Sequence, residues 1–205
     1  MTAKQRRMLK ITVALLSAVP ALVLGWRTGQ GRLGPDPLGD LVRVTGRWAL
    51  AFLILSLMPT ALRILFGMRA GLVVRRILGL YAFGYALAHF VIYAGLGFRL
   101  RWDLLSETIR QSPFILAGLG ALLLLLPLAL TSTEGWVRRL GRNWRRLHRL
   151  VYVATLFAVW HFAWAFKELR ALPLAVGLGV LFLLALRIPG VAERLRPRSE
   201  PIDEW

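Results

Sequence analysis

The sequence QSPFILAGLGALLLLLPLALTST, residues 111–133, contains no charged side chain. A helix needs roughly 20 apolar residues to cross the ~30 Å hydrocarbon core of a bilayer. The run lacks the alternation of apolar and polar residues that is typical of strands in a membrane barrel. Because helices and closed barrels are the only backbones that lipid tolerates, this run predicts a membrane-spanning helix.

Five further runs without charge extend the pattern along the chain, at 11–26, 48–62, 77–98, 150–166 and 171–186. The shorter ones reach spanning length if Lys10, Arg63 and Arg187 extend their charged ends toward the headgroups. We therefore expect an all-α fold, a polytopic membrane bundle of six transmembrane helices in a single domain over residues 1–205. The predicted spans are about 9–26, 47–66, 76–98, 112–131, 147–166 and 171–187.

Composition excludes several classes of protein. The apolar fraction of 57% exceeds the 45–50% that is usual in soluble domains. The net charge of +17 comes from basic residues that interrupt apolar runs and do not line one face, so we expect no nucleic-acid partner. The chain has no cysteine, which excludes disulfides and thiolate ligands and leaves three histidines as the strong metal ligands.

The distribution of basic residues predicts the orientation. The N-terminal segment, the 63–76 and 134–149 connections and the C-terminal tail together hold 18 of the 27, and the other side holds nine. Basic residues are enriched on the cytoplasmic side of membrane proteins, so both termini are expected in the cytoplasm and membrane lipid is the main surrounding partner. The charged start of the chain resembles a signal peptide, but no clear cleavage site follows it, and we expect it to be the first span.

Two histidines are predicted to lie at the same depth in the membrane. His89 follows Arg75 by 14 positions, and His161 follows His148 by 13, in two spans that run in the same direction. At ~1.5 Å per residue, both imidazoles lie ~20 Å from the cytoplasmic boundary. Imidazole nitrogen ligates iron, and bundle cores often hold cofactors, so His89 and His161 are the expected axial ligands of a b-type haem. Three glycines of the third span are expected to let the flat macrocycle approach the backbone: Gly79, Gly84 and Gly95.

The sequence leaves open whether a second haem, here called the inner haem, lies nearer the cytoplasmic face. His148 lies near the cytoplasmic face at the depth of Arg75 and Arg76, and is the expected metal ligand for that haem. Arginine stays protonated, so Arg75 or Arg76 is expected to pair with haem propionates rather than with iron. Ordinary positive-inside topology explains both arginines equally well. On a straight helix His148 and His161 would be ~140° apart, which requires bending or separate partners.

A haem held inside the membrane would relay electrons across it. Three alternatives compete with this hypothesis. An isolated imidazole inside a span is often neutral and bonded to a backbone carbonyl. A small proton-coupled transporter would place carboxylates inside the spans, where the charge-free runs have none. A scaffold without a cofactor would purify colourless.

The sequence resembles the MsrQ family, the haem-binding membrane subunits of bacterial periplasmic methionine sulfoxide reductase systems, which are related to ferric reductase transmembrane domains. The motifs that carry this resemblance extend over nearly the whole chain. They are Thr2-Ala3-Lys4-Gln5, Leu33-Gly34 with Asp36-Pro37, Thr45-Gly46-Arg47, Arg75-Arg76 with Leu78-Gly79-Leu80, His89, Thr131-Ser132-Thr133, Leu147-His148 with Val151-Tyr152, and His161.

The resemblance implies a haem b subunit of the bacterial inner membrane. It would relay electrons from the cytoplasmic side or the quinone pool to a periplasmic molybdopterin subunit that reduces methionine sulfoxide in oxidised proteins. The chain would thus be an electron-transfer subunit and not the sulfoxide-reducing site. The family is also associated with FMN and with a cytosolic flavin reductase or membrane quinol as donor. Another b-type cytochrome of the ferric reductase type is the alternative.

The larger superfamily holds two stacked haems with two histidines on each of two helices. In this chain the third span carries His89, and Arg75 stands 14 positions earlier, where the resemblance would place the other histidine. The second axial ligand of an inner haem is therefore not identified by the resemblance.

Overall fold

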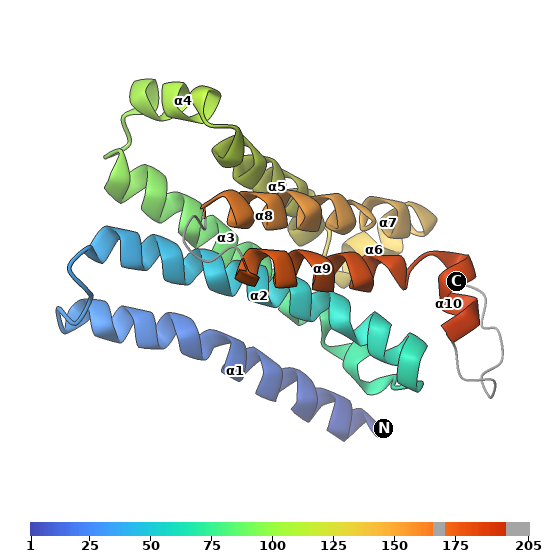
Figure 1. Ribbon diagram of the computed structural model, residues 1–205. Coiled ribbons are helices and arrows are strands. Elements are labelled where there is room, and N and C mark those ends of the chain that lie inside the picture. The colour runs from blue at the N-terminus through green and yellow to red at the C-terminus, as the bar shows by residue number, and fades with distance from the viewer. Residues whose placement is uncertain (166–170, 196–205) are drawn as a thin grey trace.

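The computed structural model describes residues 1–165 and 171–195, and within these residues the chain is all helical (Figure 1). The long helices are α1 (Ala3–Gly29), α2 (Pro37–Phe66), α3 (Arg75–Ile92), α5 (Pro113–Leu130), α8 (Leu150–Ala165) and α9 (Ala171–Ala185). Shorter elements connect them: the 3₁₀ turn η1 (Ala70–Val73), the π-turn η2 (Tyr93–Gly97), α4 (Trp102–Gln111), α6 (Glu134–Leu140), α7 (Arg142–Leu147) and α10 (Pro189–Leu195).

The second helix begins earlier than its predicted span at 47–66. Asp36 caps it by accepting a 2.9 Å hydrogen bond from the Gly39 N–H, and Pro37 occupies its first turn. Both features favour helix initiation, so the helix continues outward past the charge-free run. Arg43 and Arg47 consequently lie on helical turns and not in a loop. The helix ends at Gly67, whose φ of 68° is the left-handed conformation that glycine adopts at helix ends.

Within the described residues, four helices are long and apolar enough to cross a membrane: α1, α2, α3 with its π-turn, and α5. The pair α9 and α10 adds a fifth span if its 89° bend is counted as one broken span. The structure therefore supports four or five spans by length and composition. Some predicted features lie outside the described residues: residue 166, where the fifth predicted span ends, Lys167, Arg170 and the tail 196–205.

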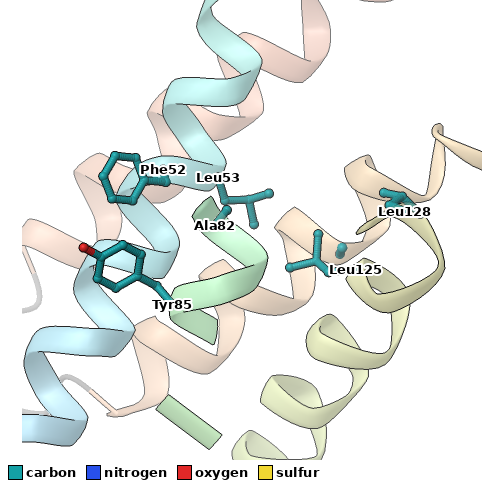
Figure 2. Close-up of a cluster of buried hydrophobic side chains, with 7 residues drawn as sticks. Phe52, Leu53, Ala82, Tyr85, Leu125 and Leu128 are labelled. Atoms are coloured by element: carbon teal, nitrogen blue, oxygen red, sulfur yellow. The ribbon is translucent and has the colours of Figure 1, made fainter. Parts of the chain in front are cut away.

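Two helix pairs form the centre of the bundle, α2 with α3 and α5 with α8. A cluster of buried side chains joins the two pairs (Figure 2). Phe52 and Leu53 come from α2, Ala82 from α3, and Leu125 from α5. Burial of this kind positions the four helices that line the candidate site described below.

The first helix lies at the edge of the bundle (Figure 1). Much of its surface is exposed, as expected for a helix that faces lipid. It is attached to α3 through the hydroxyls of Tyr81 and Tyr85, which reach its backbone. One of these contacts lies beside Pro20, where a proline removes a hydrogen bond from the helix.

The basic connections share one end of the bundle. The start of α1, the turn between α2 and α3, the α6–α7 hairpin and α10 all lie toward that end, and α4 lies toward the opposite one (Figure 1). Helices α6 and α7 carry five arginines: Arg138, Arg139, Arg142, Arg145 and Arg146. At the opposite end, Arg101 hydrogen-bonds Asp103 at 2.9 Å, which lowers the pKa of that exposed carboxyl group.

Candidate functional site

The structure brings His89 and His161 together. His89 comes from α3 and His161 from α8, and their ring centroids are 6.0 Å apart with the ring planes at 80°. Two metal–imidazole bonds of about 2.0 Å each, with the radius of each ring added, span about 6 Å. The separation of the two rings therefore suits a single metal ion bound between them.

Both imidazoles hydrogen-bond a backbone carbonyl through the same nitrogen. His89 Nδ1 lies 2.9 Å from the Val42 carbonyl of α2, and His161 Nδ1 lies 2.7 Å from the Phe114 carbonyl of α5. A carbonyl oxygen only accepts, so in each ring Nδ1–H is the donor. The lone pair is then on Nε2, the state in which a neutral histidine ligates a metal.

A glycine backs each of these rings. A Cβ atom at Gly46 would lie 3.0 Å from His89 Nδ1, and one at Gly118 would lie 2.8 Å from His161 Nδ1. Any larger residue at either place would therefore displace the ring. The glycines expected from the sequence to approach the macrocycle were Gly79, Gly84 and Gly95, but a Cβ at any of those three meets nothing within 4 Å.

The two glycines stand at the same sequence distance from the histidines that they back. His89 follows Gly46 by 43 positions, and His161 follows Gly118 by the same number. The carbonyl partner precedes its histidine by 47 positions in both cases. The two central helix pairs thus present their histidines in the same way, an internal repeat that was not recognised in the sequence.

A cavity of about 590 Å³ separates the two pairs and contains both imidazoles in its wall. This volume lies within the ~300–1,000 Å³ that is usual for cofactor sites. The wall is largely apolar, and none of the three glycines expected from the sequence lines it. Arg43 and Arg47, on the second and third turns of α2, are among the residues that line the cavity. Arg43 also pairs with Asp40 at 2.6 Å and with Asp36 at 3.4 Å.

This donor set fits a haem better than a bare metal ion. The two imidazoles could hold the iron of a haem, whose macrocycle would supply the remaining ligands. The apolar wall suits the macrocycle, and the guanidinium groups suit its anionic carboxylates. Among the described residues there is no cluster of three or more histidine, aspartate or glutamate side chains arranged for a metal.

His148 lies apart from this cavity, and its position differs from the expected one. It caps the end of α7 and precedes α8, which begins at Leu150. His148 and His161 therefore do not share one helix. The ~140° rotation between them that was expected on a straight helix does not apply. The ring stacks on Trp144 with centroids 3.8 Å apart, and Nδ1 lies 3.1 Å from the Trp144 carbonyl.

The other nitrogen of His148 is an unusual atom in the described structure. Its Nε2 is buried and has no hydrogen-bond partner there. Buried polar atoms are nearly always paired, so this atom has room for a water or a ligand, and the Leu128 backbone also acts on the ring. Arg75 and Arg76 lie close enough to act on the charge of this ring. Both arginines are at the start of α3, so this helix end is the one that acts on His148.

A fourth basic residue lies at the same end. Arg187, expected to extend toward the headgroups, instead donates to the Leu57 carbonyl of α2 at 2.7 Å. Its guanidinium lies over the Tyr152 ring, 5.4 Å from the centroid. Arg187 thereby connects α9 to α2 and α8.

Comparison with known protein families gives a match to the family described as "Ferric reductase like transmembrane component", over residues 45–159. This segment contains Gly46, Gly118, the Phe114 carbonyl, His89 and His148, and ends just before His161.

Curated relatives match over most of the chain. A protein of Xanthomonas oryzae pv. oryzae (strain MAFF 311018) is 44% identical over 165 residues, 78% of this chain and 76% of the relative. One from Rhodospirillum rubrum is 39% identical over 197 residues, 95% of this chain and 94% of the relative. Both are named "Protein-methionine-sulfoxide reductase heme-binding subunit MsrQ". No solved structure matches the chain significantly.

Proposed function

Because the chain belongs to the ferric reductase-like transmembrane family and, within it, to the MsrQ heme-binding subunits, we propose that it carries electrons through the membrane in a protein-methionine-sulfoxide reductase system. Family and apolar helices together make it a multi-pass membrane protein. The bacterial inner membrane is the location that fits this role.

The pairing of His89 with His161 carries the proposal. The two rings face one cavity from separate helices, and each is held by an Nδ1–carbonyl hydrogen bond. We assign them as the axial ligands of a haem b. A haem iron with two axial imidazoles supplies reversible one-electron transfer.

The residues around the pair have separate tasks. The Val42 and Phe114 carbonyls fix the tautomer and orientation of the two rings. The apolar wall excludes water, which strengthens the effect of nearby charge on the redox potential. Arg43 and Arg47 are the groups of the cavity wall that would hold the carboxylates of the macrocycle.

An inner haem would use His148, with Arg75 and Arg76 holding its propionates. The buried Nε2 without a partner among the described residues supports this assignment. Because an arginine occupies position 75, the second axial ligand of this haem would come from elsewhere. We propose one haem between His89 and His161, the outer site, and a second haem at His148, the inner site.

We further propose six spans with both termini in the cytoplasm. The shared location of the basic connections in Figure 1 supports this orientation, because one end of the bundle carries most of the positive charge. Electrons would then enter at the end with His148 and leave at the end with α4.

The partners follow from this orientation. A cytosolic flavin reductase or a membrane quinol would donate electrons, with FMN as a further cofactor, and a periplasmic molybdopterin subunit would receive them. That subunit would reduce methionine sulfoxide in oxidised proteins, and this chain would only deliver electrons. Another ferric reductase-like electron carrier is the second candidate, and the family match favours it over a proton-coupled transporter.

Absorption spectra of the purified, reduced protein test the assignment. His161→Ala and His89→Ala should each abolish the Soret and alpha bands of the bis-imidazole haem. Trp160→Phe is the matched control, because Trp160 precedes His161 on α8 and is 47% exposed. If both histidine variants keep the full haem spectrum, the proposed electron-relay function is contradicted.

A further inference from the structure

Each axial histidine of the candidate site is held by two backbone features of a neighbouring helix. For His89 these are Gly46 and the Val42 carbonyl of α2, and for His161 they are Gly118 and the Phe114 carbonyl of α5. In both helices the carbonyl residue precedes the glycine by one helical turn. The same arrangement thus occurs twice, on helices far apart in the sequence.

The glycines allow the short approach that these hydrogen bonds require. The ideal Cβ position at Gly118 is 2.8 Å from Nδ1, 2.9 Å from Cε1 and 3.1 Å from Cγ of His161. At Gly46 the corresponding distances from His89 are 3.0 Å to Nδ1 and 3.1 Å to Cε1. An alanine would therefore press on the ring at the atom that donates to the carbonyl.

The hydrogen bond itself changes the chemistry of the ligand. A ring that donates Nδ1–H to a carbonyl holds more electron density at Nε2 and is a stronger donor to a metal. A stronger axial donor stabilises ferric over ferrous iron and lowers the midpoint potential. Displacing the ring from the carbonyl reverses both effects.

We propose that Gly46 and Gly118 are positioning residues that hold the two axial imidazoles against the Val42 and Phe114 carbonyls and thereby set the potential of the haem. This proposal rests on the proposed function. In this proposal the two glycines do not contact iron. They position the imidazoles that would bind it.

Redox titration of the haem in the full-length protein, in detergent, tests it with Gly46→Ala and Gly118→Ala. Both variants should raise the midpoint potential, and Gly118→Ala should raise it more, because its Cβ lies closer to the ring. Haem should also be held about 10- to 100-fold more weakly, as for other partners that orient metal ligands.

Two alanine variants are matched controls. Gly120→Ala crowds the same pair of helices, since its Cβ would lie 3.0 Å from the Phe157 ring, but no ligand is touched. Gly84→Ala adds a Cβ to α3 in open space, on the same helix as His89. Neither should change the potential.

The outcomes separate this proposal from the proposed function. Unchanged potential and haem retention in both Gly46→Ala and Gly118→Ala would overturn the positioning role, while loss of haem in His161→Ala would still support the relay. A shift in Gly120→Ala equal to that in Gly118→Ala would also overturn it, by showing that general crowding is the cause. If Gly118→Ala does not fold, Gly46→Ala decides, because its 3.0 Å contact needs only a small movement.

Discussion

The hydroxyl of Tyr85 accepts a 2.9 Å hydrogen bond from the backbone N–H of Ala21, the residue after Pro20 in α1. The same hydroxyl donates to the Ser17 carbonyl at 3.0 Å. It thus bridges the backbone N–H of Ala21 and the carbonyl of Ser17, next to the Leu16 carbonyl that Pro20 leaves without its helical donor. Contacts of this kind from a neighbouring helix support a membrane helix in the region of a proline.

Tyr85→Phe removes the bridging hydroxyl and is expected to destabilise the protein. Hydrogen bonds between membrane helices contribute about 0.6 kcal/mol on average and up to about 1.7 kcal/mol. Equilibrium unfolding in mixed detergent should show a loss in that range. Tyr81→Phe is the comparison, because Tyr81 makes a single bond to the Ala14 carbonyl and its loss should cost less. Equal stability of parent and Tyr85→Phe would contradict the bridging role.

The 80° angle between the His89 and His161 rings predicts an electron paramagnetic resonance signature. Perpendicular axial rings donate into two different d orbitals of the iron, so neither orbital is raised above the other and the low-spin ferric signal is strongly anisotropic. Parallel rings would give a rhombic spectrum instead. Low-temperature spectra of the oxidised protein distinguish the two, and a rhombic spectrum would show that the rings turn on binding haem.

Arg47→Gln is expected to lower the midpoint potential of the haem. A fixed positive charge in the cavity wall favours the reduced iron, which carries less positive charge. Unit charges roughly 10 Å apart interact by about 1–2 kcal/mol at an effective dielectric constant of 20. Redox titration measures the shift, and Arg110→Gln on the exposed face of α4 should show none. A rise in potential would contradict the assigned role.

His148→Ala is expected to remove the inner haem and to leave the outer one. Its Nε2 is the buried atom without a partner among the described residues, whereas His89 and His161 lie in a separate cavity. Haem iron per chain, measured by the pyridine haemochrome assay and by total iron, gives the result. Trp144→Phe preserves a stacked ring beside His148 and serves as the control. Unchanged iron content in His148→Ala would contradict the assignment of His148 as a haem ligand.

Arg187→Leu is expected to loosen the attachment of α9. It removes the donor to the Leu57 carbonyl and the cation over the Tyr152 ring. Leaving a buried carbonyl without its donor costs about 1–3 kcal/mol. Unfolding in mixed detergent measures this loss, and Arg194→Leu on the exposed side of α10 should cost much less. Equal costs for the two variants would contradict a specific role for Arg187.

Sequence reasoning placed His89 and His161 at one depth, and in the structure their rings are neighbours. It predicted a span at 47–66, and the helix α2 that contains this span begins earlier, because Asp36 and Pro37 initiate it beyond the charge-free run. It also treated His148 as part of the fifth span, although the residue caps α7. Both differences arise at helix ends, where capping groups and not hydropathy decide the boundary.

The sequence by itself determined the helical class, the apolar runs, the charge asymmetry and the heights of the histidines. These are local properties, because each follows from side-chain polarity and from a fixed rise per residue. Only the tertiary structure decided which carbonyl holds each ring, that Gly46 and Gly118 back the rings, and that Tyr85 bridges the backbone at Pro20. Such contacts depend on how each helix is rotated about its axis and on which neighbour it packs against, and these are fixed by the packing of the whole bundle.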